Sequence, residues 1–431
     1  MPHTVYILSD LHLGAGREPA GGEWDDLERF RDDEVFCALI DEIAAERSPV
    51  ELVIAGDFID FPRVFPSLAA TFPTDRLGAT EADSVERAAL VLGQTPKLAS
   101  GHPAVFVALR RLMSNGHSIT LVVGERDVDL LWPDVWALVF DAIYPPGAPG
   151  ELRRRAFCHT IGSGAFGRVY VEHGHEHDAT CASGDQMKRP FAQDMSGAWR
   201  IRRSWGALFA DLVLTRGAPL WLDTLHPATR AMAFGLDRSL PLPAWALAQT
   251  VRFLFCHGAP RERAAPEPAP LWPAGRRTAA ALVEALRDSA LRHHLENRMA
   301  DTVFAAALER ELATFSEADW SLMAVGIERQ PLLATAEAGH GAGSLEAAQQ
   351  AAARAILDAE PAIGTVVMGH THVPHDGSSA RIERASGRAG YFFNCGAWAR
   401  GMDHDLPRPR TYLRCTPDVW GAYHVELHCV T

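Results

Sequence analysis

The sequence predicts an α/β fold in which each buried strand ends in a charged side chain. Three short runs of β-favouring apolar residues, separated by stretches with helical spacing, start at residues 5, 51 and 118. The first run leads into Asp10, the second into Asp57 and the third into Glu125. Open α/β sheets bind their ligands at the carboxyl ends of the strands, so these three acids are the first candidates for a functional site.

The composition is that of an ordinary soluble globular protein, with 431 residues of which 47% are hydrophobic and 22% charged. A chain of this length is expected to form two or three domains. The net charge of −13 argues against extensive nucleic-acid binding, which needs a positive surface. The N-terminus lacks the blocks of a signal peptide, and no apolar run reaches the length of a membrane span. Seven cysteines without a C-x-x-C pair are typical of reduced thiols, so we expect a cytoplasmic protein.

The first part of the chain alternates between helical and strand-like spacing. Helices are predicted at 25–47, 81–92, 103–114 and 131–140, and short strands at 155–161 and 167–172.

A change of texture marks a predicted insertion at 179–361. Strand-like runs almost vanish there, and Ala, Leu, Arg and Trp dominate, which favours a mainly helical segment with a last helix at 345–358. Strand-like runs return at 364–369, 391–395 and 422–430. We therefore expect one domain built from 1–178 and 362–431, interrupted by the insertion.

Seven nitrogen and oxygen donors stand at the ends of strand-like runs. They are Asp10, His12, Asp57, Glu125, His173, His370 and His372. Asp10 and His12 are two positions apart, so an extended backbone would direct both side chains to one side. Mixed imidazole and carboxylate ligation suits manganese, iron or zinc better than magnesium or calcium. Seven donors exceed the need of one ion, and with one shared carboxylate they fit two ions about 3.5–4 Å apart.

Five ordered sequence blocks resemble the calcineurin-like metallophosphoesterase superfamily. The blocks are SDLH at 9–12, GDFID at 56–60, GERD at 124–127, EHGH at 172–175 and GHTH at 369–372. The resemblance covers residues 4–178 and 364–397 and leaves the insertion unmatched. It implies a four-layered α/β/β/α fold and a dinuclear metal-dependent phosphoesterase, in which a hydroxide between the metals attacks phosphorus in line.

The resemblance also assigns roles to individual residues. Asp10, His12, Asp57 and His372 would hold the first metal, Asp57 would bridge, and Glu125, His173 and His370 would hold the second. Asp60 would orient a ligand rather than bind metal. Arg126 and Asp127 are the catalytic candidates, and His175 and Asn394 are candidates for supporting a ligand or contacting substrate. Manganese is the first choice for both ions, with iron or zinc as alternatives.

Two residues depart from the family's usual pattern. Glu125 stands where the family usually has Asn; it can still ligate, but its negative charge would make the second metal a poorer Lewis acid. Arg126 replaces the usual catalytic His, and a guanidinium cannot give a proton to a leaving group, although it can hold phosphate oxygens. An Arg at this place is typical of the UDP-diacylglucosamine diphosphatases. The resemblance thus implies hydrolysis of a phosphodiester or pyrophosphate bond in a phosphorylated small molecule or a lipid-linked substrate.

Two other functions stay open. Glu125 could mark lost activity, which would leave a metal-binding scaffold or regulatory protein. A metal-dependent nuclease is the other alternative, which the net charge of −13 disfavours. The insertion also carries a basic amphipathic segment from Trp199 to Leu214, which fits either a helical cap packed on the core or peripheral contact with an anionic membrane.

Overall fold

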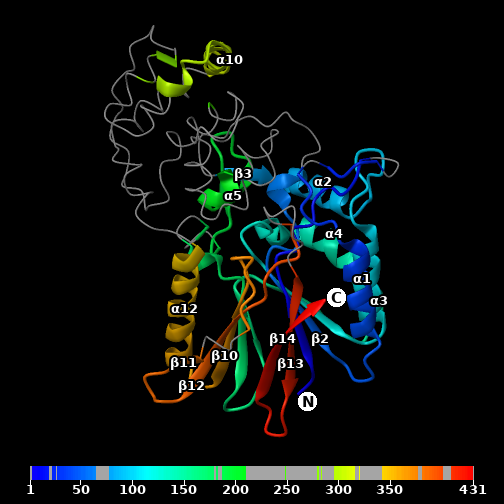
Figure 1. Ribbon diagram of the computed structural model, residues 1–431. Helices are drawn as coiled ribbons and strands as arrows, with labels where there is room; N and C mark the ends of the chain where they lie inside the picture. The colour runs from blue at the N-terminus through cyan, green and yellow to red at the C-terminus, as the bar shows by residue number, and fades with distance from the viewer. Residues whose placement is uncertain are drawn as a thin grey trace.

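The computed structural model describes residues 2–18, 22–25, 27–64, 77–178, 181–182, 187–209, 248, 279–280, 283, 296–315, 320, 342–376, 381–400 and 409–430. These residues form a mixed α/β structure with three β-sheets, which confirms the α/β part of the predicted fold class (Figure 1). The α-helices are α1 (Asp33–Ala44), α2 (Glu81–Val91), α3 (Pro103–Ser114), α4 (Pro133–Ile143), α5 (Trp205–Phe209), α10 (Thr302–Leu312) and α12 (Ala342–Ala359). Short 3-10 helices are η2 (Phe61–Arg63), η3 (Val128–Leu131) and η4 (His175–His177).

The largest sheet places the first three predicted strands side by side. Its order is β14 (Tyr423–Val430), β13 (Arg410–Pro417), β1 (Val5–Leu8), β2 (Glu51–Ala55), β4 (Ser118–Val122) and β5 (Leu152–Arg155). Strands β1, β2, β4 and β5 are parallel, and the β13–β14 hairpin, whose first strand the sequence did not reveal, adds antiparallel to β1. The carboxyl ends of β1, β2 and β4 therefore lie next to one another.

The second sheet also has a parallel centre. Its order is β11 (Arg381–Glu383), β12 (Ala389–Asn394), β10 (Ile363–Met368), β7 (Arg168–Glu172) and β6 (Cys158–Ile161). Strands β12, β10 and β7 are parallel, whereas β11 and β6 pair antiparallel at the two edges. The carboxyl ends of β7 and β10 are thus neighbours too.

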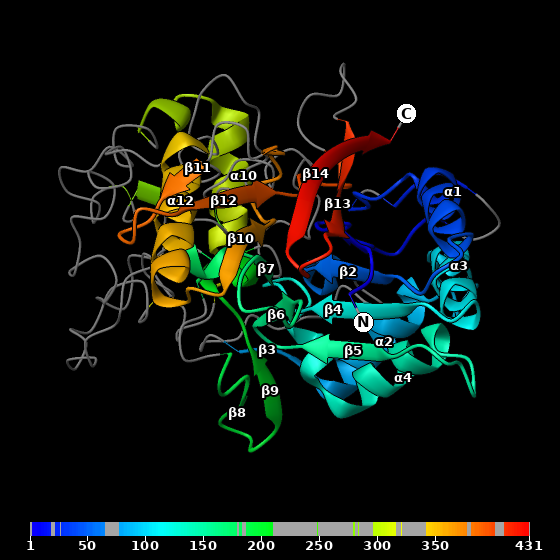
Figure 2. The same cartoon turned by 90° about the horizontal axis from the view of Figure 1, so that it is seen from below.

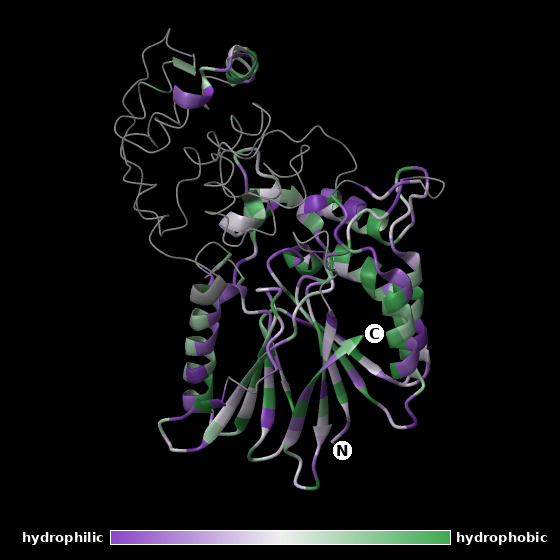
Figure 3. Ribbon diagram, viewed as in Figure 1, coloured by the Kyte–Doolittle hydropathy of each residue, from purple (hydrophilic) through white to green (hydrophobic). Residues whose placement is uncertain are grey.

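These two sheets pack face to face, with helices on their outer sides (Figures 1 and 2). Along β1, Val5 and Ile7 share a core with Val367 of the second sheet. Tyr6 and Leu8 belong to the core with helices α1 and α3. This division follows from the two-residue period of a strand. Figure 3 shows hydrophobic segments on strands of both sheets and on the helices beside them. Helix α12 covers the outer side of the second sheet, where Leu357 packs in one cluster with residues of β10 and β12.

A small third sheet lies where the sequence predicts the start of a mainly helical insertion. Strand β9 (Trp199–Arg202) pairs antiparallel with both β8 (Phe191–Gln193) and β3 (Leu77–Thr80). The sequence did not predict this sheet, because its strands are too short to show a two-residue pattern of hydrophobicity. In addition, β3 comes from a part of the chain far before β8 and β9. The rest of the amphipathic segment predicted from Trp199 to Leu214 includes α5, and its residues beyond 209 lie outside the described residues. Within the described ranges, no helix has the length and hydropathy that a membrane crossing needs.

Arg203, directly after β9, is buried rather than presented on a basic surface. Its Nη1 lies 2.5 Å from Oδ2 of Asp129, and its Nη2 donates to Oδ1 of the same residue over 3.0 Å. Asp129 Oδ1 also accepts a hydrogen bond from Ser84 at 2.6 Å. The segment after β9 is thereby tied to η3 and α2. In the same segment Arg200 pairs with Asp194 at 2.5 Å.

The loop after β1 is held by a buried carboxylate. The carboxylate of Glu28 accepts hydrogen bonds from the backbone N–H groups of Gly14, Gly16 and Phe30 at 3.3, 2.7 and 2.8 Å. The helical spacing predicts that the helix begins near residue 25, but α1 begins at Asp33. The hydrogen bonds of Glu28 explain the difference, because they hold residues 28–30 in the loop structure. His102 completes the cluster, since its Nε2 lies 3.0 Å from Glu28 Oε2 and its Nδ1 lies 2.9 Å from Asp33 Oδ1.

The His102 cluster makes stability depend on pH in a defined direction. Burial by itself would lower the pKa of His102, but Glu28 and Asp33 raise it to about 9. The unfolded chain has the ordinary value of about 6.5. The stabilising contribution is therefore fully present below about pH 6.5 and is lost as the pH rises through about 9. We expect His102→Asn to lower the free energy of unfolding by roughly 2–3 kcal/mol at pH 6, and by much less at pH 9.5.

Urea unfolding at the two pH values measures this difference. The exposed His424 supplies the control, because His424→Asn should change stability little at either pH. An equal loss for His102→Asn at both pH values would contradict a charged His102 in the folded protein.

Candidate metal centre

The first three acidic candidates come from neighbouring strand ends in the larger sheet. Asp10 follows β1, Asp57 follows β2 and Glu125 follows β4. The parallel ladder continues past the strands, because the N–H of Asp10 donates to Gly56 O at 3.1 Å and the N–H of His12 donates to Asp57 O at 2.9 Å. The loops after β1 and β2 thus stay in register and present their side chains together.

The remaining candidates come from neighbouring strand ends in the second sheet. His173 follows β7, and His370 and His372 follow β10. The two loops are joined by the N–H of Gly369, which donates to His173 O at 3.0 Å. The N–H of His370 donates across the interface to Oδ2 of Asp10 at 2.9 Å. All seven predicted ligands are therefore delivered to one place, and each is at most 6% exposed.

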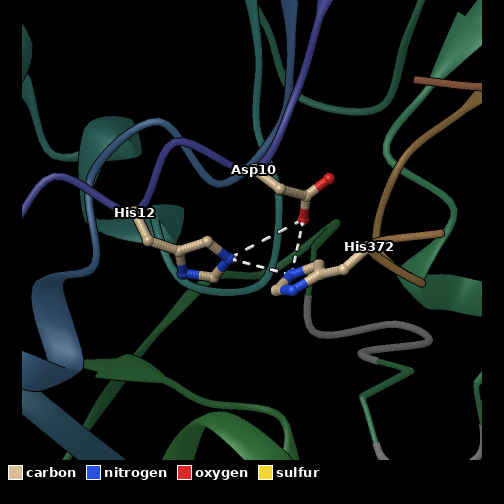
Figure 4. A group of neighbouring side chains, drawn as sticks. All are labelled: Asp10, His12 and His372. Atoms are coloured by element: carbon tan, nitrogen blue, oxygen red, sulfur yellow. Dashed lines mark hydrogen bonds and ion pairs between the residues drawn. The ribbon is translucent and has the colours of Figure 1, made fainter. Parts of the chain in front are cut away.

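One group of donors gathers around Asp10, His12 and His372, whose ligand atoms point toward one another (Figure 4). Nε2 of His12 lies 3.7 Å from Asp10 Oδ1 and 3.2 Å from His372 Nε2. Nε2 of His372 lies 3.2 Å from Asp10 Oδ1. Asp57 adjoins this group, with Oδ2 3.6 Å from His12 Nε2.

A second group gathers on the other side of Asp57. Nε2 of His173 lies 3.3 Å from Asp57 Oδ2 and 2.9 Å from Glu125 Oε2. Nδ1 of His370 lies 3.3 Å from Glu125 Oε1. Oδ2 of Asp57 therefore faces imidazoles of both groups, which is the position that a bridging ligand requires.

The backbone at these donors is held in a conformation that side chains rarely adopt. Among the described residues, the non-glycine residues with positive φ are Asp10, His12, Asp57, His370 and His372, with φ between 51° and 69°. Each such conformation costs about 1–3 kcal/mol and persists only where the surrounding structure enforces it. All of them are predicted metal ligands, so the strain is concentrated at this site.

Two glycines in the sequence blocks are required by close approach. A Cβ on Gly56, which has φ +93°, would lie 2.3 Å from the ring of His173. A Cβ on Gly124 would lie 2.2 Å from Asp57 Oδ1. Any side chain at these positions would push a donor out of the cluster.

The donor set fits divalent cations. Asp10 Oδ1, Asp57 Oδ2, Glu125 Oε2 and His173 Nε2 are buried and have no hydrogen-bond partner in the part of the chain that the structure describes. Buried polar atoms normally have partners, because burying one without a partner costs about 1–3 kcal/mol. Here the atoms without partners converge on one another. The arrangement can hold metal through oxygen and nitrogen donors, the chemistry preferred by ions such as manganese, iron and zinc.

Neighbouring groups leave one nitrogen of each of three imidazoles available to a metal. Nδ1 of His12 donates to Asp60 Oδ2 at 3.0 Å, and Nδ1 of His173 donates to Ala55 O at 2.8 Å. A carboxylate or carbonyl oxygen can only accept, so the proton lies on Nδ1 and Nε2 of each ring faces the cluster. His370 has the opposite arrangement, since its Nε2 donates to Asp178 Oδ2 at 3.1 Å and its Nδ1 faces Glu125.

The buried carboxylates and imidazoles of the centre shift one another's pKa values. Burial alone would raise the pKa of the Asp10 carboxyl, but His173 and His372 hold it well below its ordinary value. His370 and His173 do the same for Glu125. Burial lowers the pKa of His372 to about 3 despite Asp10, with Arg29 adding to the effect. Although burial alone would lower them, neighbouring carboxylates in turn raise the pKa of His12 to about 9 and hold the pKa values of His173 and His370 well above the ordinary value. Without a metal, the centre is therefore a set of buried ion pairs, and a bound cation would take the place of the proton on the ring nitrogen that faces the cluster.

The two catalytic candidates lie in the loop after β4. Arg126 is buried, with Nη1 3.9 Å from Asp60 Oδ1 and Nε 3.7 Å from Glu125 Oε1. Its backbone N–H donates to Asp57 Oδ1 at 3.0 Å. Both carboxylate oxygens of Asp127 are used by the backbone, accepting from Phe58 N–H at 2.8 Å and from Gly124 N–H at 2.6 Å. This bonding joins the loops after β2 and β4.

The environment of Asp127 also shifts the pKa of its carboxyl. Burial and the neighbouring Asp57 raise the pKa of its carboxyl to about 8. Its position fits a residue that shapes the site, and its predicted catalytic role stays a prediction.

The supporting candidates occupy different positions. Asn394, at the end of β12, donates to Gly369 O at 2.7 Å and to Thr371 Oγ1 at 3.1 Å, so it shapes the loop that carries His370 and His372. His175 has a ring nitrogen within 4.8 Å of ligand atoms of Glu125 and His173. His175 thus lies beside the donors, and its predicted role in supporting a ligand or contacting substrate stays a prediction.

Three further residues of the site were not among the sequence-based candidates. Cys181 groups with Glu125 and His370, with ligand atoms within 4.8 Å of one another. Arg29 lies behind His372, with Nη2 3.4 Å from its Nδ1. Gln349 of α12 donates to Gly369 O at 3.1 Å, although it belongs to the predicted insertion. None of these three residues directly follows a strand, so a search for donors at strand ends could not identify them.

Comparison of the sequence with the models of known protein families found no match, and comparison with curated proteins found none either.

Proposed function

We propose that the protein is a metal-dependent phosphoesterase of the calcineurin-like superfamily, with a dinuclear centre. The observation that carries the proposal is the convergence of seven buried carboxylate and imidazole donors from five parallel strand ends. The left-handed backbone at five of them adds weight, because strain of this kind clusters at functional sites. The order of the five sequence blocks is the further support.

The packing agrees with a four-layered α/β/β/α sandwich. One face of each sheet lies against the other sheet, helices α1 and α3 lie on one outer side, and α12 lies on the other. The donors sit where the carboxyl ends of both sheets meet, as expected for ligands of open α/β sheets.

The proposed ligand sets share Asp57. Asp10, His12, Asp57 and His372 form the first set, and Asp57, Glu125, His173 and His370 form the second. Two bound divalent ions would supply an activated water as nucleophile and would neutralise charge on phosphate oxygens. Manganese is the first choice, with iron or zinc as alternatives.

The chain's own residues hold the substrate and the ligands in place. The guanidinium of Arg126 lies beside Glu125 and Asp60, and it offers planar N–H donors to the oxygens of a phosphoryl group. Asp60 and Asp178 hold the rings of His12 and His370 in their orientations. Because Arg126 cannot give up a proton, the site favours a leaving group that departs as a phosphate anion. A pyrophosphate linkage in a nucleotide sugar or lipid-linked substrate fits this demand.

One observation favours a second candidate function. Glu125 brings an additional negative charge beside His173 and His370, which would weaken the Lewis acidity of a metal held there. A metal-binding scaffold or regulatory protein without turnover would tolerate this charge.

Metal analysis together with hydrolysis assays tests the proposal. We expect about two transition-metal ions per chain, and hydrolysis of bis(p-nitrophenyl) phosphate that depends on added manganese, iron or zinc. Nucleotide sugars, lipid pyrophosphates and cyclic nucleotides then define the substrate class, and single-stranded DNA and RNA test the nuclease alternative. Two bound ions without hydrolysis of any of these would favour the scaffold, and a chain that binds no transition metal would refute both.

Arg126→Lys separates phosphate binding from metal binding. Lysine keeps the charge but loses the planar pair of donors, so we expect unchanged metal content and a decrease in hydrolysis of about 10²-fold. The exposed Arg47 provides the control, since Arg47→Lys should leave both quantities unchanged. Full activity of Arg126→Lys would remove Arg126 from the proposed mechanism.

A further inference from the structure

The donors around Glu125 exceed the set that the proposed function uses. Glu125 belongs to two groups of potential ligands, one with His173 and His175 and one with Cys181 and His370. Its Oε2 faces His173 and its Oε1 faces His370. The carboxylate of Glu125 therefore lies between two sets of donors. One set has the imidazoles of His173 and His175, and the other has the imidazole of His370 and the sulfur of Cys181.

Cys181 is linked by its backbone to a residue of the second ligand set's surroundings. Its N–H donates to Asp178 O at 3.0 Å, and the side chain of Asp178 accepts from Nε2 of His370. Cys181 is 1% exposed. Its Sγ, a carboxylate oxygen of Glu125 and a ring nitrogen of His370 all lie within 4.8 Å of one another. This spacing matches three ligands of one ion.

The surroundings of Cys181 differ from those of an ordinary buried cysteine. Cys415 of β13, for comparison, packs among apolar residues between the two sheets. Cys181 instead lies among ionisable groups, namely Asp178, Glu125 and His370. Glu125 Oε2, which is buried, and both ring nitrogens of His175 have no hydrogen-bond partner among the residues described. Donor atoms without hydrogen-bond partners thus gather at Glu125, the carboxylate that Cys181 adjoins.

We propose that Cys181 is a ligand of the ion held by Glu125 and His370, so that this position has nitrogen, oxygen and sulfur donors. The inference rests on the proposed function, because it concerns the second of the two metal positions. On binding, the S–H bond breaks, a sulfur–metal bond forms and the proton passes to buffer.

Sulfur ligation would change which metal the second position selects. Thiolate is a soft ligand that favours zinc or iron, whereas the carboxylate and imidazole donors of the first position also suit manganese. The negative charge of Glu125 also favours tight binding of a divalent ion at the second position, because anionic ligands neutralise the charge of the ion. The two positions would then hold different metals, with the softer ion beside Glu125.

X-ray absorption of the full-length chain loaded with zinc tests the assignment directly. A thiolate ligand gives a zinc–sulfur shell at about 2.3 Å, distinct from nitrogen and oxygen shells at about 2.0–2.2 Å. We expect this shell in the wild type and in Cys415→Ala, and its loss in Cys181→Ala. Cobalt loading supplies a second measurement, because a thiolate ligand produces a charge-transfer absorption band that Cys181→Ala should lack.

Affinity gives a third readout that is separate from activity. Mutation of a residue that only hydrogen-bonds to a metal ligand typically lowers metal affinity by about 10- to 100-fold. Loss of a ligand itself in Cys181→Ala should therefore lower the affinity of the second position for zinc by at least about tenfold, and leave the affinity of the first position unchanged. Bound zinc with only nitrogen and oxygen shells in the wild type would overturn the inference and leave the proposed function standing. A wild type that binds no zinc, manganese or iron would overturn the proposed function itself.

Discussion

Replacement of Asp57 by asparagine is expected to remove both metal ions and nearly all hydrolysis. Oδ2 of Asp57 lies 3.6 Å from Nε2 of His12 and 3.3 Å from Nε2 of His173, so one oxygen serves both ligand sets. An amide in its place lacks the charge that two divalent ions share. We expect metal content to fall from about two ions to well below one, and hydrolysis of an aryl phosphodiester to fall by at least about 10³-fold.

The measurement is metal content by mass spectrometry alongside the initial rate of hydrolysis. Asp41→Asn is the matched control, because Asp41 is an exposed carboxylate on α1 that pairs with Arg111 at the surface. Near-ultraviolet circular dichroism checks that the Asp57 variant is folded. Unchanged metal content and unchanged hydrolysis in folded Asp57→Asn would show that the proposed site is wrong.

Glu125→Ala is expected to remove one metal ion and to spare the other. Glu125 lies near the rings of His173 and His370 and belongs only to groups on that side of Asp57. The Asp10, His12 and His372 group does not include it. We expect metal content to fall from about two ions to about one, and hydrolysis to decrease by about 10²–10³-fold, because one of the two charge-stabilising groups is lost.

Glu125→Asn is the informative companion of this variant. Its amide oxygen can ligate without the charge, so two ions and measurable hydrolysis are expected to remain. If the wild type binds metal but is inactive and Glu125→Asn gains hydrolysis, the scaffold interpretation is the correct one. Two retained ions in Glu125→Ala would mean that Glu125 is not a ligand.

The strand-end residues could be identified from the sequence because their placement follows from local pattern. Asp10, Asp57 and Glu125 each come directly after a run of apolar residues that forms a strand. Parallel neighbouring strands bring their carboxyl ends together, so side chains far apart in the chain meet without further information. The fold class was predictable for the same reason.

Other features needed long-range pairing that no local pattern reveals. Strand β13 (Arg410–Pro417) pairs with β1 from the opposite end of the chain, and β9 pairs with β3 across more than a hundred residues of sequence. The late start of α1 depends on Glu28, whose carboxylate is drawn into the loop after β1 by backbone N–H groups. Helical spacing could not anticipate this competing interaction.

For the metal centre, the sequence by itself determined which side chains stand at the strand ends, since a strand's last residues are set by the local apolar run. Only the tertiary structure decided that Asp57 Oδ2 lies between two groups of imidazoles and that Asp60 and Asp178 fix which ring nitrogens are available. It also decided that Cys181 joins Glu125 and His370. The physical reason is that ligand geometry depends on how the two sheets pack and on contacts between residues far apart in the chain, and the spacing of residues along the sequence specifies neither.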